Sequence, residues 1–451
     1  MWLRQDLRVE DQPAFHAATA EGAVIPVYVL DDEAPGRWRM GAAQRWWLHH
    51  SLSALRRDLE ARGSRLILRR GGVTAELARI ASDVGATRVH ATAHYEPWWR
   101  AAEKEVAAAL DLALHPGDVL ASPSQVMTRA GTPYRIYTPC WRALQDHLPP
   151  ETPLPAPQHL AGPAAWPESD DLASWRLLPA EHDWAAAFGA EWSPGEASAR
   201  AGLEQFAEEV EHYADARDQP GEEGTSRLSP HLHFGEVSPR SVWHRLGSAG
   251  ADKFRKELAW RDFSRNVILD QPWLGARAGR PAFASFPWRT GEAAEPDFAA
   301  WKKGLTGYPL VDAGMRQLWA TGWMHNRVRM VAASFLVKHL LLDWRRGAEW
   351  FWDTLVDADY ANNSQNWQWV AGTGVDSQPF YRIMAPTAQS RKFGAAKYIR
   401  RWVPELAGLD DEAVHEPTRE VGDYPLPIIP HRAARERALS ALRAFGASDL
   451  A

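Results

Sequence analysis

The feature that most constrains the fold is a change in hydrophobic pattern well before the middle of the chain. In the first 130 residues, short apolar runs alternate with helical patterns, which is typical of a doubly wound parallel sheet with helices between its strands. Beyond Gly195 almost every segment has helical periodicity, and no run alternates like a strand. The sequence therefore predicts a Rossmann-like α/β domain at the N-terminus followed by an all-α domain.

The elements of the α/β half can be placed by residue number. We expect strands at 23–30, 65–68 and 87–91, and helices at 44–62, 74–84 and 96–112. Residues 148–194 are rich in Pro, which continues neither a helix nor a central strand, so they are predicted to connect two domains. We expect an α/β domain at 1–130, a linker at 131–195 and a helical domain at 196–451.

The first residues bear on where the natural chain begins and on where in the cell the protein is expected. Residues 1–4 resemble only the end of a strand, which leaves open whether Met1 is the natural start and predicts a weakened core beside this strand. The N-terminus is charged from Arg4 onward and lacks the apolar stretch of a secretory signal. The best apolar run, 331–342, is too short to span a bilayer. We therefore expect a cytoplasmic protein with no membrane partner.

The cysteine content excludes several classes of site. Cys140 is the only cysteine, so the chain can form neither an internal disulfide nor a Cys-ligated iron–sulfur cluster. No motif completes a set of metal ligands, so no metal is expected. We also expect a monomer.

The charge distribution contains one basic stretch. The net charge of −6 argues mildly against a nucleic-acid partner, because nucleic-acid-binding domains are usually basic. Residues 377–404, however, carry six Lys and Arg side chains and no Asp or Glu. They are Arg382, Arg391, Lys392, Lys397, Arg400 and Arg401. The stretch could contact phosphates, although charge alone favours a solvated helix face.

A first candidate site is the sequence Gly-Thr-Ser-Arg-Leu-Ser-Pro at 224–230. Its hydroxyl and backbone N–H groups precede a helix that Pro230 can open, and such a helix N-terminus binds phosphate. Capping of the helix by Ser229 explains part of the motif equally well, and the sequence alone gives this alternative more weight.

Two helix faces bring polar and apolar side chains together. Glu257, Trp260 and Arg261 are spaced i, i+3 and i+4, and Asn326 and Met330 are also i and i+4. Such faces could line a pocket for a heteroaromatic ligand, because amides and carboxylates bind ring edges while indoles and thioethers cover ring faces. An ion pair between Glu257 and Arg261 on a solvated helix is an equally good interpretation.

Residues 357–369 form the third pattern. Asp357 and Asp359 are followed by an Asn pair and then by Trp367 and Trp369. On a helix, side chains two residues apart point to nearly opposite faces, so one indole can face inward while the other faces a cleft. A metal site at the two aspartates has little support, because nothing nearby completes its ligands.

Taken together, six motifs resemble the photolyase/cryptochrome family and follow the family's order. They are residues 4–8, 223–229, 257–263, 307–313, 322–330 and 357–369. The resemblance covers nearly the whole chain, and within the family the sequence is most similar to bacterial class I cyclobutane pyrimidine dimer photolyases.

This resemblance implies a deoxyribodipyrimidine photolyase that binds FAD in its helical domain and acts on UV-damaged DNA. The implied reaction is light-driven repair, in which excited reduced FAD gives one electron to a flipped-out dimer, the ring opens and the electron returns. The main alternative is a cryptochrome-type blue-light photoreceptor, although the roughly 50 residues after Arg401 would be too few for a long signalling tail. A nicotinamide oxidoreductase is disfavoured, because no Gly-x-Gly-x-x-Gly follows the first strand.

The resemblance also implies roles for individual residues. Those expected around FAD are Tyr213, Thr225, Ser226, Arg227, Leu228, Ser229, Phe254, Arg261, Arg329, Asp357, Asp359 and Asn363. Those expected to bind the lesion or DNA are Glu257, Trp260, Arg261, Asn326, Arg327, Met330, Trp369, Arg382, Arg391 and Lys392. The expected catalytic set is Glu257, Asn326, Met330 and Asn363, and the expected electron-transfer chain from the surface is Trp367, Trp344 and Trp301.

Three residues in these sets bear on substrate and activity. Asn363 matches the position that faces flavin N5, where a neutral amide favours the reduced flavin and where cryptochromes commonly differ. Photolyases for the 6-4 lesion carry His residues around the lesion pocket, whereas the matching residues here are Asn326 and Met330, which implies the cyclobutane dimer.

One motif departs from the family's folate-type antenna site. The family has Tyr-Glu-X-Asn followed by Glu, but Tyr95 and Glu96 are followed here by Pro97, Trp98 and Trp99. A folate antenna is therefore in doubt. A deazaflavin, a flavin or no second chromophore stays open.

Overall fold

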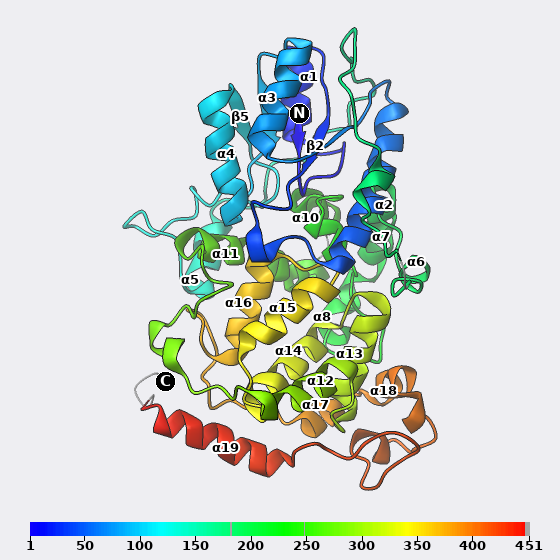
Figure 1. Cartoon of the computed structure of the whole chain (residues 1–451), viewed down its shortest axis with the longest axis vertical. Helices are drawn as coiled ribbons and strands as arrows, with labels where there is room; N and C mark the ends of the chain where they lie inside the picture. Colours follow the sequence, from blue (N-terminus) through cyan, green and yellow to red (C-terminus); the bar gives the residue numbers. More distant parts are fainter. Residues whose placement is uncertain (181–182, 248, 447–451) are drawn as a thin grey trace. The chain divides into compact units, whose positions relative to one another are not determined.

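The computed structural model of the protein describes residues 1–180, 183–247 and 249–446 (Figure 1). The chain divides into two compact units. The first contains Met1–Glu211, Ser226–Pro272 and Val356–Ala361, and the second contains His212–Thr225, Trp273–Leu355 and Asn362–Ala451. The expected boundaries near residues 130 and 195 do not coincide with this division. Among the described residues, no helix combines the length and the apolar character needed to cross a bilayer.

The first unit is built on a five-stranded parallel sheet with the strand order β3-β2-β1-β4-β5, a Rossmann-like order. The strands are β1 (Trp2–Leu3), β2 (Val27–Leu30), β3 (Ile67–Arg70), β4 (Val89–Thr92) and β5 (Leu112–His115). The expected strands are present, and β5 is an addition that begins at the last residue assigned to a helix. No named strand of the described residues follows His115, so the predicted fold class is confirmed.

The helices of the first unit are α1 (Pro13–Glu21), α2 (Ala42–Glu60), α3 (Val73–Val84), α4 (Pro97–Ala109), α5 (Tyr137–Gln145), α6 (Phe188–Glu191), α7 (Glu196–Glu209), α9 (Ser229–His233), α10 (Pro239–Arg245) and α11 (Asp252–Asp270). Of these, α1, α3 and α4 contact strands of the sheet. Helices α3 and α4 contact each other, and their Leu77, Ile80 and Val106 join strand residues such as Val27 and Ile67 in one buried core.

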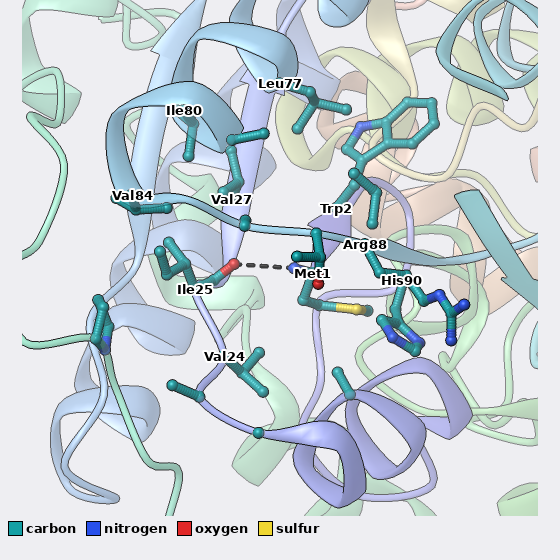
Figure 2. Close-up of a pocket in the computed structure, with 18 of the residues that line it drawn as sticks. Met1, Trp2, Val24, Ile25, Val27, Leu77, Ile80, Val84, Arg88 and His90 are labelled. Atoms are coloured by element: carbon teal, nitrogen blue, oxygen red, sulfur yellow. Dashed lines mark hydrogen bonds between the residues drawn. The ribbon is translucent and has the colours of Figure 1, made fainter. Parts of the chain in front are cut away.

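The first strand is short, as expected. It lies in the middle of the sheet but pairs through Trp2 and Leu3 alone, whereas β2 and β3 pair through four residues each. Beside Met1 lies a cavity of about 310 Å³ that Val24 and Ile25 help to line (Figure 2). The Met1 ammonium group donates to the Ile25 carbonyl oxygen at 3.0 Å, and burial lowers the pKa of this group to about 5. The expected weakening of the core beside this strand stays a prediction.

The Pro-rich segment 148–194 is bonded to the body of the first unit and is not a free linker between domains. The backbone N–H of Asp170 donates to the Leu68 carbonyl oxygen at 2.8 Å, and that of Leu160 donates to the Arg62 carbonyl oxygen at 2.9 Å. The segment therefore belongs to the body of the first unit.

The second unit is helical. Its helices are α8 (Tyr213–Ala216), α12 (Glu295–Lys303), α13 (Pro309–Thr321), α14 (Asn326–Ser334), α15 (Trp344–Thr354), α16 (Tyr360–Ala371, whose first two residues belong to the first unit), α17 (Pro386–Lys392), α18 (Ala396–Trp402) and α19 (His431–Ala444). Helix α13 contacts α12, α14, α17 and α18. Its buried Asp312 accepts hydrogen bonds from the Tyr424 hydroxyl at 2.6 Å and the Thr306 hydroxyl at 2.7 Å. These bonds tie the C-terminal part of the chain to α13.

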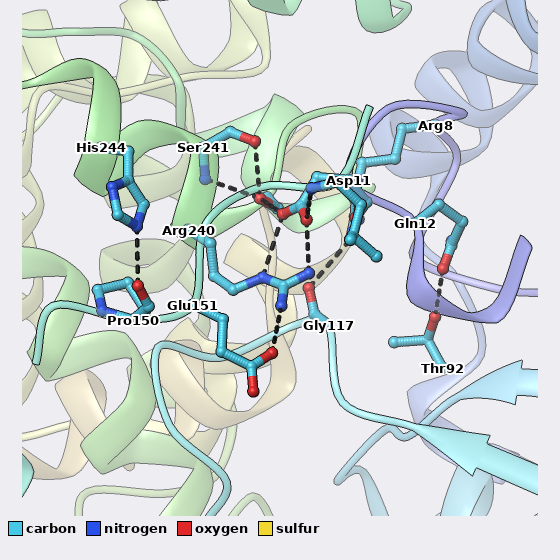
Figure 3. A network of polar contacts seen from close by, with 12 residues as sticks. Arg8, Asp11, Gln12, Thr92, Gly117, Pro150, Glu151, Arg240, Ser241 and His244 are labelled. Carbon is cyan, nitrogen blue, oxygen red and sulfur yellow. Dashed lines mark hydrogen bonds and ion pairs between the residues drawn. The ribbon is translucent and has the colours of Figure 1, made fainter. Parts of the chain in front are cut away.

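A buried ion pair joins the N-terminal segment to α10 within the first unit (Figure 3). The Asp11 carboxylate accepts hydrogen bonds from Arg240 and Ser238, and its side chain is fully buried. The neighbouring Arg8 donates to the Asp11 and Gly117 carbonyl oxygens at 2.9 and 3.0 Å. Because a buried charge without a partner is costly, Asp11 and Arg240 hold these segments together.

Removal of the Asp11 charge is expected to destabilise the protein strongly. Asp11→Asn leaves the buried guanidinium of Arg240 without its main partner, and breaking a buried pair costs about 3–5 kcal/mol. Glu151→Gln is the matched control, because Glu151 contacts the same guanidinium at 3.3 Å with a side chain that is 86% exposed. Exposed pairs contribute about 0–1 kcal/mol. Urea unfolding followed by circular dichroism measures both changes, and equal losses would contradict this interpretation.

Candidate functional site

The predicted site residues are divided between the two units. In the first unit, α11 carries Glu257, Trp260 and Arg261, residues 226–229 precede and begin α9, and Asp357 and Asp359 precede α16. In the second unit, α14 carries Asn326 to Met330, and α16 carries Asn363, Trp367 and Trp369. Each predicted helix face therefore lies on one continuous helix.

Arg261 is buried. It donates to the carboxylate and the carbonyl oxygen of Asp118, and to the Leu232 carbonyl oxygen at 3.2 Å. The alternative of a surface ion pair between Glu257 and Arg261 is therefore wrong. The structure also does not support a DNA contact by Arg261, because its donors are used inside the protein.

A second arginine of α11 links this pair to a predicted cofactor residue. Arg265 Nε donates to the Asp118 carboxylate at 2.9 Å, and Arg265 Nη2 lies 3.3 Å from Asp359 Oδ2. Burial alone would raise the pKa of Asp118, but Arg261 and Arg265 outweigh it and hold this pKa well below its usual range. Asp118 therefore stays ionised and fixes both arginines.

Buried polar atoms remain without partners around this cluster. They are both ring nitrogens of His94, Oε1 of Glu96, Nδ1 of His233 and Nη1 of Arg265, none of which has a hydrogen-bond partner among the described residues. Burial raises the pKa of Glu96 to about 7 and lowers that of His233 to about 4. Because buried polar groups normally find partners, these donors and acceptors fit a polar ligand such as FAD.

Ser229 does not cap α9. The N-cap position is Leu228, and the Ser229 hydroxyl donates to Asp357 Oδ2 at 2.6 Å. The favoured alternative of helix capping by Ser229 is therefore wrong. The bond joins two residues that the resemblance assigns to FAD, although they are 128 positions apart in the sequence.

Other predicted cofactor residues contact protein groups within their own units. Arg227 Nη2 donates to Glu191 Oε2 at 3.1 Å. Phe254 is buried against Phe206, with ring centroids 4.8 Å apart. In the second unit, Tyr213 is buried.

The indole of Trp260 is half-buried and has one covered face. The Tyr137 ring stacks on it with a centroid distance of 3.7 Å and an interplanar angle of 5°. Phe263 approaches the indole edge-on at 5.5 Å. Tyr137 therefore covers one face of an indole that is only partly buried.

In the second unit, the amide of Asn363 is fixed in orientation. Its Nδ2 donates to the Ala348 carbonyl oxygen at 3.0 Å. The amide oxygen is therefore the atom of this side chain that can accept a further hydrogen bond.

The tryptophans of α16 differ in burial, as expected. Trp367 is buried, with Trp301 at 6.2 Å between ring centroids, while Trp369 is half-buried. Trp301 is fully buried and Trp344 is 1% exposed, and the ring pairs of the described residues do not include Trp344. The expectation that these indoles reach the surface is therefore wrong.

An exposed indole pair nearby was missed by sequence reasoning. Trp319 is 54% exposed and stacks on Trp350 with a centroid distance of 5.9 Å. Lys302 lies 4.9 Å from the ring centroids of both Trp350 and Phe298, and Phe298 stacks on Trp301 at 5.9 Å. Only the order of aromatic residues on α12, α13 and α15 could have indicated this pair.

Helix α14 presents Asn326 and Met330 at its accessible side. Asn326 is exposed and Met330 is half-buried. Two neighbouring arginines are held by the protein: Arg327 pairs with Asp218 at 2.8 Å, and Arg329 Nε donates to the Met324 carbonyl oxygen at 2.6 Å.

The basic stretch 377–404 is partly neutralised. Arg391 pairs with Glu412 at 3.2 Å and Glu416 at 3.4 Å, and Arg400 pairs with Asp411 at 2.7 Å. These carboxylates follow the stretch in sequence, so its charge pattern overstated the free positive charge. Arg382 is exposed, and its side chain has no ion-pair partner among the described residues.

Comparisons with known families and curated proteins agree on one family. Residues 1–158 match the family model described as DNA photolyase, and residues 254–444 match that of the FAD binding domain of DNA photolyase. The chain is 45% identical to a deoxyribodipyrimidine photo-lyase of Agrobacterium fabrum, covering 98% of this chain and 97% of the relative. It is also 36% identical to cryptochrome-1 of Arabidopsis thaliana, covering 98% of this chain and 70% of the relative.

Solved structures agree with this result. A class III photolyase from Agrobacterium tumefaciens is 44% identical with a TM-score of 0.93, covering 99% of this chain and 97% of that one. An archaeal photolyase from Sulfolobus tokodaii with two FAD molecules is 28% identical with a TM-score of 0.84, and the match covers 98% of this chain and 99% of that one. The first match does not support the expected class I.

These comparisons confirm the predicted kind of enzyme, a DNA photolyase, and the expected FAD-binding domain. A second chromophore is consistent with the archaeal structure. The chain therefore belongs to the photolyase/cryptochrome family.

Proposed function

We propose that the protein is a class III photolyase that uses light to reverse cyclobutane pyrimidine dimers in UV-damaged DNA. The name of the Agrobacterium fabrum relative supports the substrate, and the class III structure supports the class. The structural observation that carries the proposal is the orientation of Asn363.

The Asn363 amide is suited to a reduced flavin. Because its nitrogen is bound to the Ala348 carbonyl oxygen, its oxygen can accept a hydrogen bond from a protonated flavin N5. Such a bond favours the reduced state that repair requires. Reduced FAD, when bound and excited by light, supplies the electron that opens the cyclobutane ring.

The remaining polar groups suit the phosphates and ribityl chain of FAD. In this proposal the hydroxyls of 225–229 contact the phosphates, while Asp357 and Asp359 line the rest of the cofactor. Ser229 and Arg265 hold these two carboxylates at 2.6 and 3.3 Å, so their orientation is set before the cofactor binds.

The residues that the resemblance assigns to the lesion have distinct proposed roles. Glu257 and Asn326 hydrogen-bond to the damaged bases, Trp260 and Trp369 cover the base planes, and Met330 packs beneath them. A dimer must leave the DNA stack to reach such residues, and its weak stacking lowers the cost of extrusion. Glu257 stabilises the dimer through this hydrogen bond, at the place where negative charge develops.

The indoles at the antenna motif have packing roles. Trp98 lies edge-on to Tyr360 at 5.1 Å, and Trp99 is buried edge-on to Trp2 at 6.3 Å. We therefore propose that this motif does not hold a folate in the family's usual way. An absorption spectrum of the purified protein, taken before and after denaturation, identifies the flavin and any second chromophore.

A repair assay tests the proposed function. The reduced protein is expected to restore an oligonucleotide that contains one dimer under near-UV or blue light, with no restoration in the dark. The readout is the amount of intact oligonucleotide. Failure to repair with flavin bound and reduced would reject the proposal and favour a photoreceptor role like that of the cryptochrome relatives.

Photoreduction of the flavin tests a proposed path for electrons through the indoles of the second unit. We propose that electrons enter at Trp319 and pass through Trp350 and Trp301 to Trp367. Trp367→Phe is expected to abolish photoreduction of oxidised flavin, and Trp350→Phe is expected to slow it, because each removes an indole from the route. Flavin absorbance during illumination measures both.

The matched control for this route is Trp273→Phe. Trp273 is 45% exposed and has no ring contact among the described residues. Photoreduction in this variant is expected to match that of the wild type. A wild-type rate for Trp350→Phe would reject the entry through Trp319.

Two variants compare an arginine of the basic stretch that has no ion-pair partner among the described residues with one that is neutralised by carboxylates. The affinity for DNA falls as salt rises, because each phosphate contact releases counterions. Arg382→Ala is expected to make the plot of log affinity against log salt concentration less steep by about 1. Arg391→Ala is expected to have a smaller effect, since Glu412 and Glu416 already bind this guanidinium. Titrations at several salt concentrations measure both slopes, and the reverse order would contradict this assignment.

A further inference from the structure

An aromatic residue outside the predicted sites covers the proposed lesion platform. Tyr137 is the first residue of α5, in the segment that the sequence assigned to a linker. Its ring lies 3.7 Å from that of Trp260 between centroids and is parallel to within 5°. Within either unit of the described residues no parallel ring pair is closer, and this pair involves an indole proposed to stack on a base.

The position of Tyr137 is fixed independently of Trp260. Its hydroxyl donates to the Lys256 carbonyl oxygen at 3.1 Å, one turn before Trp260 on α11. Two further bonds join α5 and the residues before it to α11: Asn266 Nδ2 donates to Cys140 Sγ at 3.7 Å, and Arg135 Nε to Asp270 Oδ2 at 2.8 Å. Tyr137 therefore forms a rigid support.

We propose that Tyr137 is a positioning residue for lesion binding, which holds the Trp260 indole so that a damaged base stacks on the face opposite Tyr137. This inference rests on the proposed function. Tyr137 covers one face of the indole, and Phe263 contacts its edge at 5.5 Å, so the ring cannot rotate without losing both contacts.

The benefit of this support is preorganisation. An indole that is already immobile loses little conformational freedom when a base stacks on it, whereas a mobile side chain must be ordered at a cost in affinity. The support also sets the side of Trp260 from which the base approaches. It should therefore raise affinity for DNA with an extruded base and leave binding to intact duplex unchanged.

Two variants of Tyr137 separate the ring from the hydroxyl. Tyr137→Leu removes the stacked ring, and affinity for an oligonucleotide with one dimer is expected to fall roughly three- to tenfold. Tyr137→Phe keeps the ring and loses only the bond to Lys256, so its affinity is expected to stay within about twofold of the wild type. Fluorescence anisotropy titrations with damaged and undamaged oligonucleotides of the same sequence measure these affinities.

A double-mutant cycle excludes a general loss of structure. In a Trp260→Ala background, Tyr137→Leu is expected to have no further effect on binding of the dimer, because the supported ring is absent. The flavin absorption spectrum of each variant should match that of the wild type. Additive losses in the cycle, equal losses for damaged and undamaged DNA, or wild-type affinity of Tyr137→Leu would each overturn the inference.

Measurements on the wild-type protein distinguish a failure of the Tyr137 inference from a failure of the proposed function. Wild-type protein with no preference for dimer-containing DNA would reject the proposed function itself. A wild-type preference that Tyr137→Leu leaves intact would reject only the role of Tyr137.

Discussion

A guanidinium that is buried away from water must keep its carboxylate partners, and this requirement organises the first unit. Arg265 lies between Asp118 and Asp359, at 2.9 and 3.3 Å, and Arg261 uses the same Asp118. Leaving either guanidinium unpaired would cost several kcal/mol, about 3–5 in comparable buried pairs. The sharing of one carboxylate therefore fixes α11 to the segment after β5, and Arg265 also orients the Asp359 carboxylate.

Helix α16 has an equivalent anchor within the second unit. Asn363 is bound to the Ala348 carbonyl oxygen at 3.0 Å, and the buried ammonium of Lys338 donates to the Ala371 and Phe380 carbonyl oxygens at 3.0 and 2.8 Å. These bonds act near both ends of the helix. They constrain the helix that carries Asn363, the proposed flavin contact, and the two indoles Trp367 and Trp369, which differ in burial.

The aromatic side chains make different kinds of contact in the two units. Tyr137 covers a face of Trp260 in the first unit, whereas indoles of the second unit contact one another from Trp367 to Trp301 and from Trp350 to Trp319. The count of 24 Trp cannot distinguish these uses, because an indole can fill a core, stack on a ring or carry an electron. Burial and ring geometry separate them.

The sequence by itself determined the fold class, the family and the helix faces, because periodicity and motif order are local properties of the chain. It also indicated that Trp367 and Trp369 point to nearly opposite faces of a helix. Tertiary structure alone decided the partners: Arg261 binds Asp118 instead of Glu257, Ser229 binds Asp357 instead of capping its helix, and Glu412 neutralises Arg391. These partners are distant in sequence or follow the motif concerned, and spacing within a motif says nothing about which distant charge or ring the fold brings against it.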